Sequence, residues 1–131
     1  MIASDKVLVV DIDGTLCPIK PTSDSYADLP VNEPLRDRLN NLHAQGWRIV
    51  LASARGMRTF DGNTGEIAKN VLPMLLDWLE RHDVHFDEIN MAKPWPGHNG
   101  FYIDDRTVRP REFLTHTLEE LDAICARDRC L

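Results

Sequence analysis

Short apolar runs alternate with helical patterns along this chain. Residues 6–11 (Lys-Val-Leu-Val-Val-Asp) and 47–52 (Trp-Arg-Ile-Val-Leu-Ala) form continuous apolar runs, which are typical of strands covered on both faces. A weaker run at 88–91 and the run Phe101-Tyr102-Ile103 predict two further strands. Strands that alternate with helices at this spacing predict an α/β fold, a three-layer Rossmann-like parallel sheet with helices on both faces.

Three helices are predicted between and after these strands. Asn32 can cap a helix that has Pro34 in its first turn and that ends at Gly46. A second helical pattern continues to Arg81, although Pro73 should kink that helix or split it in two. The apolar positions of the three helices are Leu35, Leu39 and Leu42; then Ile67, Val71, Leu72, Leu75, Leu76 and Leu79; then Leu114, Leu118, Leu121 and Cys125.

Length and composition narrow the class of protein. The chain has 131 residues and a mass of 15.0 kDa, which predicts one domain over 1–131. The polar, proline-containing segment at about 17–31 is expected to form a small flap. Hydrophobic residues at 43% and charged residues at 27% are ordinary for a globular protein and exclude a disordered or fibrous chain.

Charge and hydropathy argue against two classes of partner, nucleic acid and membrane. A net charge of -6 argues against a protein that binds nucleic acid through sequence-independent phosphate contacts. The N-terminus lacks the pattern of a signal peptide, and no apolar run approaches the roughly 18 residues that span a bilayer. We therefore expect a cytoplasmic protein with no membrane partner.

Polar residues with related chemistry follow the predicted strands. Because the carboxyl ends of parallel strands meet at one edge of a sheet, these residues are expected to converge there. Carboxylates suit Mg²⁺, and a lysine balances phosphoryl charge, so the sequence predicts a site for a hard cation and a phosphate. The residues are Asp11-Ile12-Asp13-Gly14-Thr15, Ser53-Ala54-Arg55, Lys93 and Asp104-Asp105-Arg106.

The spacing of the residues that follow the first strand indicates what each could do chemically. Asp11 and Asp13 are two residues apart, so in an extended chain both side chains face one site. Gly14 permits a sharp turn, which should leave the amides of Gly14 and Thr15 free to receive an anion. A carboxylate that accepts a phosphoryl group beside one that donates a proton makes Asp11 the candidate nucleophile and Asp13 the candidate acid/base.

These residues resemble the four motifs of the haloacid dehalogenase-like (HAD) phosphohydrolases, in the order of that superfamily. Residues 11–16 resemble motif one, Ser53 motif two, Lys93-Pro94 motif three and Asp104-Asp105 motif four. Within the superfamily, residues 52–59 and 93–106 look most like a small group of capsule-polysaccharide biosynthesis phosphatases.

The resemblance implies a role for each matched residue. Asp11 would attack phosphorus to form an aspartyl-phosphate, and Asp13 would protonate the leaving group and later activate water. Ser53 would hydrogen-bond a phosphoryl oxygen, while Lys93 would neutralise charge on Asp11 and the phosphoryl group. Positioning and charge stabilisation of this kind supply most of the catalysis in phosphoryl transfer.

The resemblance also implies a Mg²⁺ cofactor and a set of substrate contacts. Asp104 would coordinate Mg²⁺ together with Asp11 and the backbone carbonyl of Asp13, and Asp105 would support the metal through water. Trp95 and Tyr26 could contact the leaving group or simply pack. The residues that could bind substrate are Gly14, Thr15, Ser53, Arg55, Arg58, Lys93 and His98.

Neither gap between motifs has room for the cap domain that is usual in this superfamily. A capless enzyme has an open site, so it accepts a bulky substrate or uses a neighbouring subunit as its lid, and we expect a homo-oligomer, a dimer or tetramer. The expected reaction is Mg²⁺-dependent hydrolysis of a phosphomonoester, on a small metabolite such as a sugar phosphate in surface-polysaccharide biosynthesis. A polynucleotide phosphatase, a protein phosphatase and a phosphomutase would use the same core.

Two alternative hypotheses place the chain outside the enzymes, as a signalling module or as a noncatalytic binding module. A receiver-type signalling module also combines aspartates, a hydroxyl, a lysine and Mg²⁺, but it would place its acceptor Asp after a middle strand, where this chain has Ser53. A noncatalytic phosphate- or metal-binding module would be expected to have lost a motif residue, and none is lost. Cys17 is interpreted as a packing residue, because no nearby His or Lys would activate its thiol.

Overall fold

The computed structural model describes residues 5–21 and 25–129. The chain divides into two compact units, one that extends to Trp95 and one that begins at Pro96, and each is described by itself. Strands and helices alternate through the first unit, and the fold is α/β as the sequence predicts. That residues 1–131 act as one domain stays a prediction.

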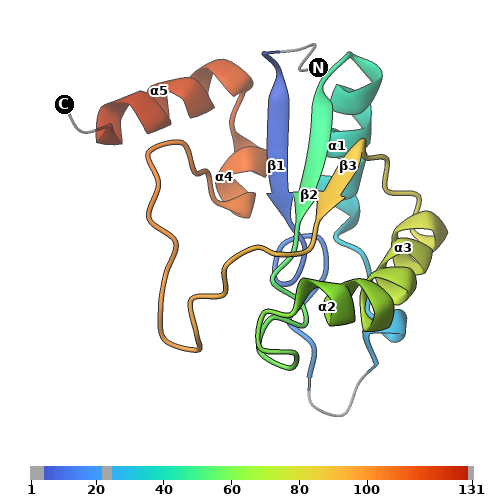
Figure 1. The fold of residues 1–131 in the computed structure, drawn as a ribbon. Coiled ribbons are helices and arrows are strands. Elements are labelled where there is room, and N and C mark those ends of the chain that lie inside the picture. The colour runs from blue at the N-terminus through green and yellow to red at the C-terminus, as the bar shows by residue number, and fades with distance from the viewer. Residues whose placement is uncertain (1–4, 22–24, 130–131) are drawn as a thin grey trace. The chain divides into compact units, whose positions relative to one another are not determined.

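The first unit is built on a parallel sheet. Among the described residues the sheet has three strands, β1 (Val7–Asp11), β2 (Arg48–Ala52) and β3 (Glu88–Asn90), in the order β1-β2-β3 (Figure 1). Asp11 pairs with Ala52, which pairs in turn with Asn90, so the three carboxyl ends are aligned. The strands predicted at 6–11, 47–52 and 88–91 are therefore confirmed.

Helix α1 (Glu33–Ala44) follows the sequence prediction at both ends. The side chain of Asn32 accepts a hydrogen bond from the Leu35 amide at 3.3 Å, which satisfies one of the free donors of the first turn. Gly46, with a φ of 100°, lets the chain leave the helix in a left-handed conformation. The helix packs on β2 through its buried leucines, Leu35, Leu39 and Leu42.

Helices α2 (Thr64–Asn70) and α3 (Leu72–Arg81) replace the single helix that periodicity alone would give. The break falls at Val71, as expected for a helix whose next turn contains Pro73. The core of this unit lies between the helices and the sheet. Its fully buried apolar side chains are Ile12, Leu16, Leu39, Ile49, Leu51, Ile67, Leu75, Trp78 and Leu79.

The predicted flap contains a short 3₁₀ helix, η1 (Tyr26–Asp28), while residues 22–24 lie outside the described part. The segment is attached to α3 by two hydrogen bonds. Trp78 Nε1 donates to the carbonyl of Leu29 at 2.8 Å, and Arg81 Nη2 donates to the carbonyl of Ala27 at 3.1 Å. Because Trp78 and Leu29 are buried, the end of the flap is part of the core.

The second unit contains α4 (Pro110–Thr115) and α5 (Leu118–Asp128). One closing helix through Leu114 was predicted, and that prediction is wrong. The pattern is divided because Thr117 caps the start of α5: its hydroxyl accepts from the Glu120 amide at 3.1 Å while the Glu120 carboxylate accepts from the Thr117 amide at 2.9 Å. Across the part of the chain that the structure describes, no helix has the length and apolar character needed to cross a bilayer.

The strand predicted at residues 101–103 is also wrong, because this segment has no regular secondary structure. Phe101 is 85% exposed and Ile103 is 98% exposed. A strand exists only where a neighbouring strand completes its ladder of hydrogen bonds, and the sheet in the described residues ends with β1 on one side and β3 on the other. Apolar composition alone is therefore not sufficient to predict a strand here.

Replacing Trp78 with Phe tests the attachment of the flap. The substitution leaves the buried carbonyl of Leu29 without its donor, so we expect the free energy of unfolding to fall by about 1–3 kcal/mol. Urea denaturation followed by circular dichroism measures the change. The matched control Trp95→Phe alters a side chain that is 40% exposed and should cost less than about 0.5 kcal/mol. Equal losses in the two variants would contradict the assignment.

Candidate active site

A tight loop follows β1 and fixes the residues that come after it. The carbonyl of Ile12 accepts hydrogen bonds from the amides of Thr15 at 3.1 Å, Leu16 at 2.9 Å and Cys17 at 3.2 Å. Gly14 has a φ of 88°, a left-handed conformation that other residues rarely adopt. The loop is anchored in the core, since Ile12 and Leu16 are fully buried.

The amides of this loop are not the free anion site that the sequence predicts. The Gly14 amide donates to the carbonyl of Cys17 at 2.8 Å, and the Thr15 amide donates to the carbonyl of Ile12. The left-handed turn at Gly14 folds the loop back on itself, so both N–H groups are used internally. The expectation that they receive a phosphate is therefore corrected.

Asp11 ends β1 and is held on both carboxylate oxygens. Lys93 Nζ donates to Oδ1 at 2.9 Å, and the hydroxyl of Thr15 donates to Oδ2 at 3.0 Å. The lysine is brought there by its backbone, because the Lys93 amide donates to the carbonyl of Ser53 at the end of β2. The structure thus brings together Asp11, Ser53 and Lys93 from three sequence-predicted motifs, with a positive charge against the Asp11 carboxylate.

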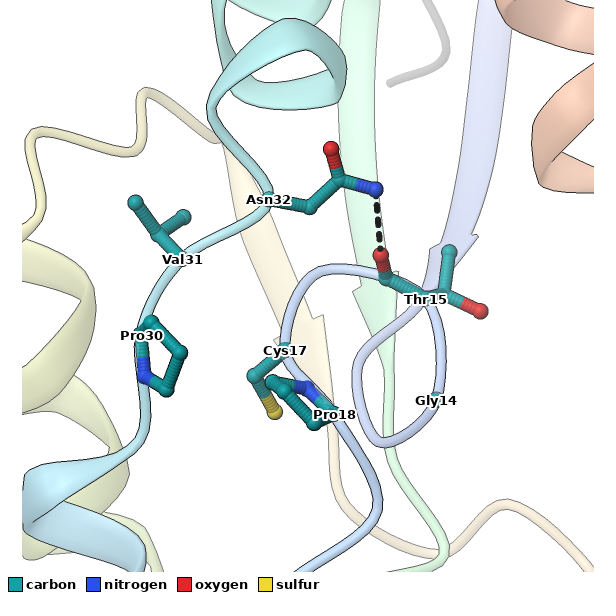
Figure 2. A pocket seen from close by; sticks show the side chains of 7 residues that line it. All are labelled: Gly14, Thr15, Cys17, Pro18, Pro30, Val31 and Asn32. Atoms are coloured by element: carbon teal, nitrogen blue, oxygen red, sulfur yellow. Dashed lines mark hydrogen bonds between the residues drawn. The ribbon is translucent and has the colours of Figure 1, made fainter.

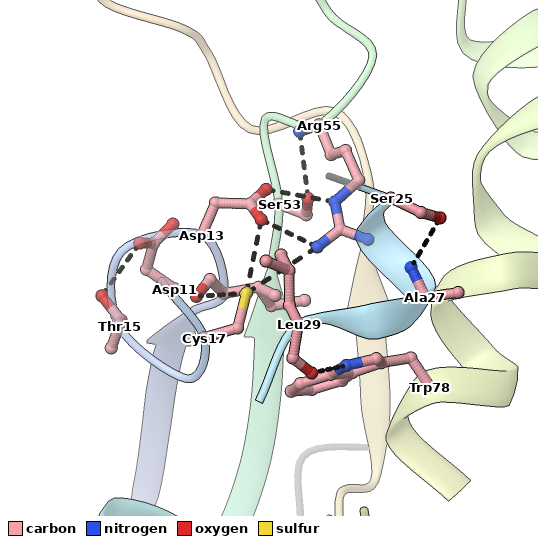
Figure 3. Close-up of polar contacts among 11 residues, drawn as sticks. Asp11, Asp13, Thr15, Cys17, Ser25, Ala27, Leu29, Ser53, Arg55 and Trp78 are labelled. Atoms are coloured by element: carbon pink, nitrogen blue, oxygen red, sulfur yellow. Dashed lines mark hydrogen bonds and ion pairs between the residues drawn. The ribbon is translucent and has the colours of Figure 1, made fainter. Parts of the chain in front are cut away.

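Asp13 forms an ion pair with Arg55 and does not project freely into solvent. Arg55 Nη2 donates to Asp13 Oδ1 at 2.7 Å and Nε donates to Oδ2 at 3.1 Å, a bidentate ion pair (Figure 3). Only 4% of the Arg55 side chain is exposed, against 25% for Asp13. The sequence analysis placed Arg55 among the substrate contacts, whereas the structure directs these two donor groups to Asp13.

The flap covers this ion pair. The Arg55 guanidinium lies 3.9 Å from the centre of the Tyr26 ring, and Lys20 Nζ lies 5.2 Å from the same ring. A cation over an aromatic face is stabilised by the ring quadrupole. Burial and the nearby Asp13 carboxylate raise the pKa of Tyr26, so its hydroxyl stays protonated at neutral pH. Lys20 was not singled out from the sequence, where the flap shows no periodic signal.

Ser53 lies directly after β2 and is 1% exposed. Its hydroxyl oxygen accepts from the Arg55 amide at 3.0 Å, and its own amide donates to the carbonyl of Asn90 at 2.8 Å. These bonds position the turn that carries Arg55. A hydrogen bond from Ser53 to a phosphoryl oxygen stays a prediction.

Cys17 lies within the same polar cluster. Its thiol donates toward Asp13 Oδ1 at 3.5 Å, and Arg55 Nη2 lies 3.9 Å from the sulfur. Burial, reinforced by the negative charge of Asp13, raises the pKa of Cys17 to about 12. The residue is buried, in agreement with its interpretation as a packing residue.

Two further candidates lie in the loops of the first unit. The Arg58 guanidinium is 5.9 Å from the centre of the Trp95 ring, and Trp95 is 40% exposed.

A hollow of about 250 Å³ lies between the loop after β1 and the residues that precede α1 (Figure 2). Asn32 stabilises its rim by donating from Nδ2 to the carbonyl of Thr15 at 3.2 Å. The lining residues are Gly14, Thr15, Cys17, Pro18, Pro30, Val31 and Asn32.

The remaining predicted residues, His98, Asp104 and Asp105, belong to the second unit and are exposed. The carboxylate of Asp104 accepts from the Arg106 amide at 2.9 Å. That of Asp105 accepts from Arg129 Nε at 2.9 Å, which lowers the pKa of Asp105. Within residues 5–21 and 25–129, no group of three or more His, Cys, Asp or Glu side chains is arranged to hold a metal ion.

Comparison with known proteins relates the chain to a solved structure. No family model and no curated protein matches the chain. The crystal structure of an MCSG target from Vibrio cholerae is similar, with 42% sequence identity and a TM-score of 0.88, and the match covers 95% of this chain and 99% of that chain. At this identity and coverage the chain belongs to the same family as the Vibrio cholerae protein.

The raised pKa of Cys17 predicts an inert thiol. With a pKa of about 12 and almost no exposed surface, Cys17 should stay unmodified by iodoacetamide at pH 8, where the half-buried Cys125 is alkylated. In urea both should react alike, because unfolding returns the Cys17 pKa to its usual 9.0. Peptide mass spectrometry reads each site separately. Alkylation of Cys17 in the native protein as fast as in urea would contradict the burial described above.

Proposed function

We propose that this protein is a Mg²⁺-dependent phosphohydrolase with a capless HAD-like core, which cleaves a phosphomonoester through an aspartyl-phosphate on Asp11. The observation that supports it best is the contact between Asp11 Oδ1 and Lys93 Nζ at 2.9 Å, at the carboxyl end of β1. A carboxylate there can act as nucleophile, and the ammonium group beside it offsets the charge of an incoming phosphoryl group.

The first step forms one bond and breaks another. A carboxylate oxygen of Asp11 attacks phosphorus as the bond to the leaving oxygen breaks, and Asp13 supplies the proton that this oxygen takes up. Arg55 holds both oxygens of Asp13 and so fixes the orientation of that side chain. Because a carboxylate in this bidentate pair carries no proton, one Asp13 oxygen must leave the guanidinium before Asp13 holds the proton that it transfers. In the second step Asp13 accepts a proton from the water that attacks the aspartyl-phosphate, and phosphate is released.

The residues in the first unit suit a magnesium ion in type but do not complete a site. Asp11 would supply a carboxylate oxygen and Asp13 its backbone carbonyl, and oxygen ligands of this kind are those that Mg²⁺ prefers. The bound ion would neutralise phosphoryl oxygens during transfer. Asp104, which is exposed in the second unit, is the further ligand that the resemblance implies.

The substrate we propose is a small phosphorylated metabolite such as a sugar phosphate. This part of the proposal rests on the resemblance of residues 52–59 and 93–106 to the capsule-polysaccharide biosynthesis phosphatases, because neither Asp11 nor Lys93 lines the hollow beside Thr15. A panel of sugar phosphates, nucleotides, a 5′-phosphorylated oligonucleotide and a phosphopeptide, assayed for phosphate release with Mg²⁺ and with EDTA, tests both parts of the proposal. Release from the oligonucleotide or the phosphopeptide alone would reassign the substrate class.

Asp11→Asn should lower phosphate release by about 10³-fold or more, because an amide cannot serve as the phosphoryl acceptor. The comparison is made by initial rates at saturating Mg²⁺, with folding checked by circular dichroism. Asp37→Asn, which neutralises an exposed carboxylate on α1, is the matched control and should keep full activity. Normal turnover by Asp11→Asn would exclude covalent catalysis at this residue.

A further inference from the structure

The Arg55 guanidinium has a second contact besides the one with Asp13. Its Nη2 and Nε atoms donate to the two oxygens of Asp13 (Figure 3), and the guanidinium also lies over the face of the Tyr26 ring, 3.9 Å from the ring centre. Only 4% of the Arg55 side chain is exposed. The attraction between a cation and an aromatic ring is stronger where water is excluded, so this contact holds the guanidinium in place.

The ring of Tyr26 is positioned by the backbone of the flap. Tyr26 is the first residue of η1, and its carbonyl accepts a hydrogen bond from the Leu29 amide at 3.4 Å. The Leu29 carbonyl accepts in turn from Trp78 Nε1 on α3, at 2.8 Å. Both Leu29 and Trp78 are buried, so the place of the ring is set by the core of the first unit.

Asp13 depends on Arg55 for its direction. Among the described residues, the other side chain that donates to this carboxylate is Cys17, whose thiol is a weak donor at 3.5 Å. In the proposed mechanism one oxygen of Asp13 leaves the guanidinium before Asp13 holds a proton. If the guanidinium moved with that oxygen, the carboxyl group would lose its direction. A guanidinium that stays against Tyr26 keeps the second oxygen, and Asp13 then turns about a fixed contact.

We propose that Tyr26 is a positioning residue for the reaction. Its ring holds Arg55 while one oxygen of Asp13 is released to carry the proton, so the other oxygen stays bound and the carboxyl group stays directed at the leaving oxygen. Tyr26 acts through Arg55 and touches neither phosphorus nor the attacking carboxylate. The inference rests on the proposed function for the role of Asp13.

Two leaving groups distinguish this positioning from a general structural role. The alcohol of a sugar phosphate needs a proton as it leaves, whereas 4-nitrophenolate leaves without one, so the sugar phosphate alone depends on the proton donor. In Tyr26→Leu we expect kcat/KM for the sugar phosphate to fall by about tenfold or more, with little change for 4-nitrophenyl phosphate. Tyr26→Phe keeps the ring face and should keep the wild-type ratio of the two values.

Ser25→Ala is the matched control. It removes the hydrogen bond that Ser25 Oγ accepts from the Ala27 amide at 3.3 Å, and so loosens the flap without changing the ring. Its two kcat/KM values should change by the same factor. An equal loss on both substrates in Tyr26→Leu would overturn the proposal, as would a Tyr26→Phe that behaves like Tyr26→Leu. Tyr26→Met replaces Tyr26→Leu in this comparison if circular dichroism shows the leucine variant to be unfolded.

An NMR measurement tests the positioning without any assay of activity. The Nε–H of Arg55 is assigned as the resonance that is lost in Arg55→Lys, and we expect it to exchange slowly with water, because it is buried and bonded to Asp13. Exchange should be about tenfold faster or more in Tyr26→Leu and unchanged in Tyr26→Phe. Equal exchange in all of these proteins would overturn the proposal. A wild type inactive on every substrate would refute the proposed function instead, while the exchange rates would still decide the role of Tyr26.

Discussion

The buried ion pair between Asp13 and Arg55 joins the parts of the first unit that surround the candidate site. Asp13 comes from the loop after β1 and Arg55 from the turn after β2, and the ring of Tyr26 in the flap lies against the guanidinium. Removing Asp13 would leave the buried Arg55 guanidinium without its counter-charge, at a cost of about 3–5 kcal/mol. The pair therefore couples the position of the proposed acid/base to the folding of two loops and the flap.

The sheet supplies the second constraint, because its register aligns the ends of its strands. Asp11 stands at the end of β1, Ser53 follows β2, and Lys93 comes shortly after β3. Lys93 reaches Asp11 only because its backbone is bonded to Ser53, so a hydrogen bond between loops positions a charge. The proposed chemistry depends on both contacts.

Local signals in the sequence were sufficient for most of the first unit. Asn32 and Gly46 marked the ends of α1, Pro73 marked the division between α2 and α3, and apolar runs marked the strands. The meeting of Asp11 with Lys93 was also predictable, because parallel strands end at one edge. The capping pattern of Thr117 and Glu120 was visible in the sequence but was outweighed by the apolar periodicity around it.

The predictions that failed depend on contacts distant in the sequence or on the detailed path of the backbone. The bond between Arg55 and Asp13 joins residues 42 positions apart, and no local pattern specifies it. The amides of Gly14 and Thr15 donate hydrogen bonds within the loop after β1, to the carbonyls of Cys17 and Ile12. The prediction of a strand at 101–103 failed because strand formation requires a neighbouring strand, which composition cannot supply.

The central claim, that Asp11 becomes phosphorylated, is tested most directly by stopping the reaction during turnover and reducing the protein with borohydride. The account predicts homoserine at position 11, found by peptide mass spectrometry only when substrate is present. Steady phosphate release with an unmodified residue 11 would contradict it.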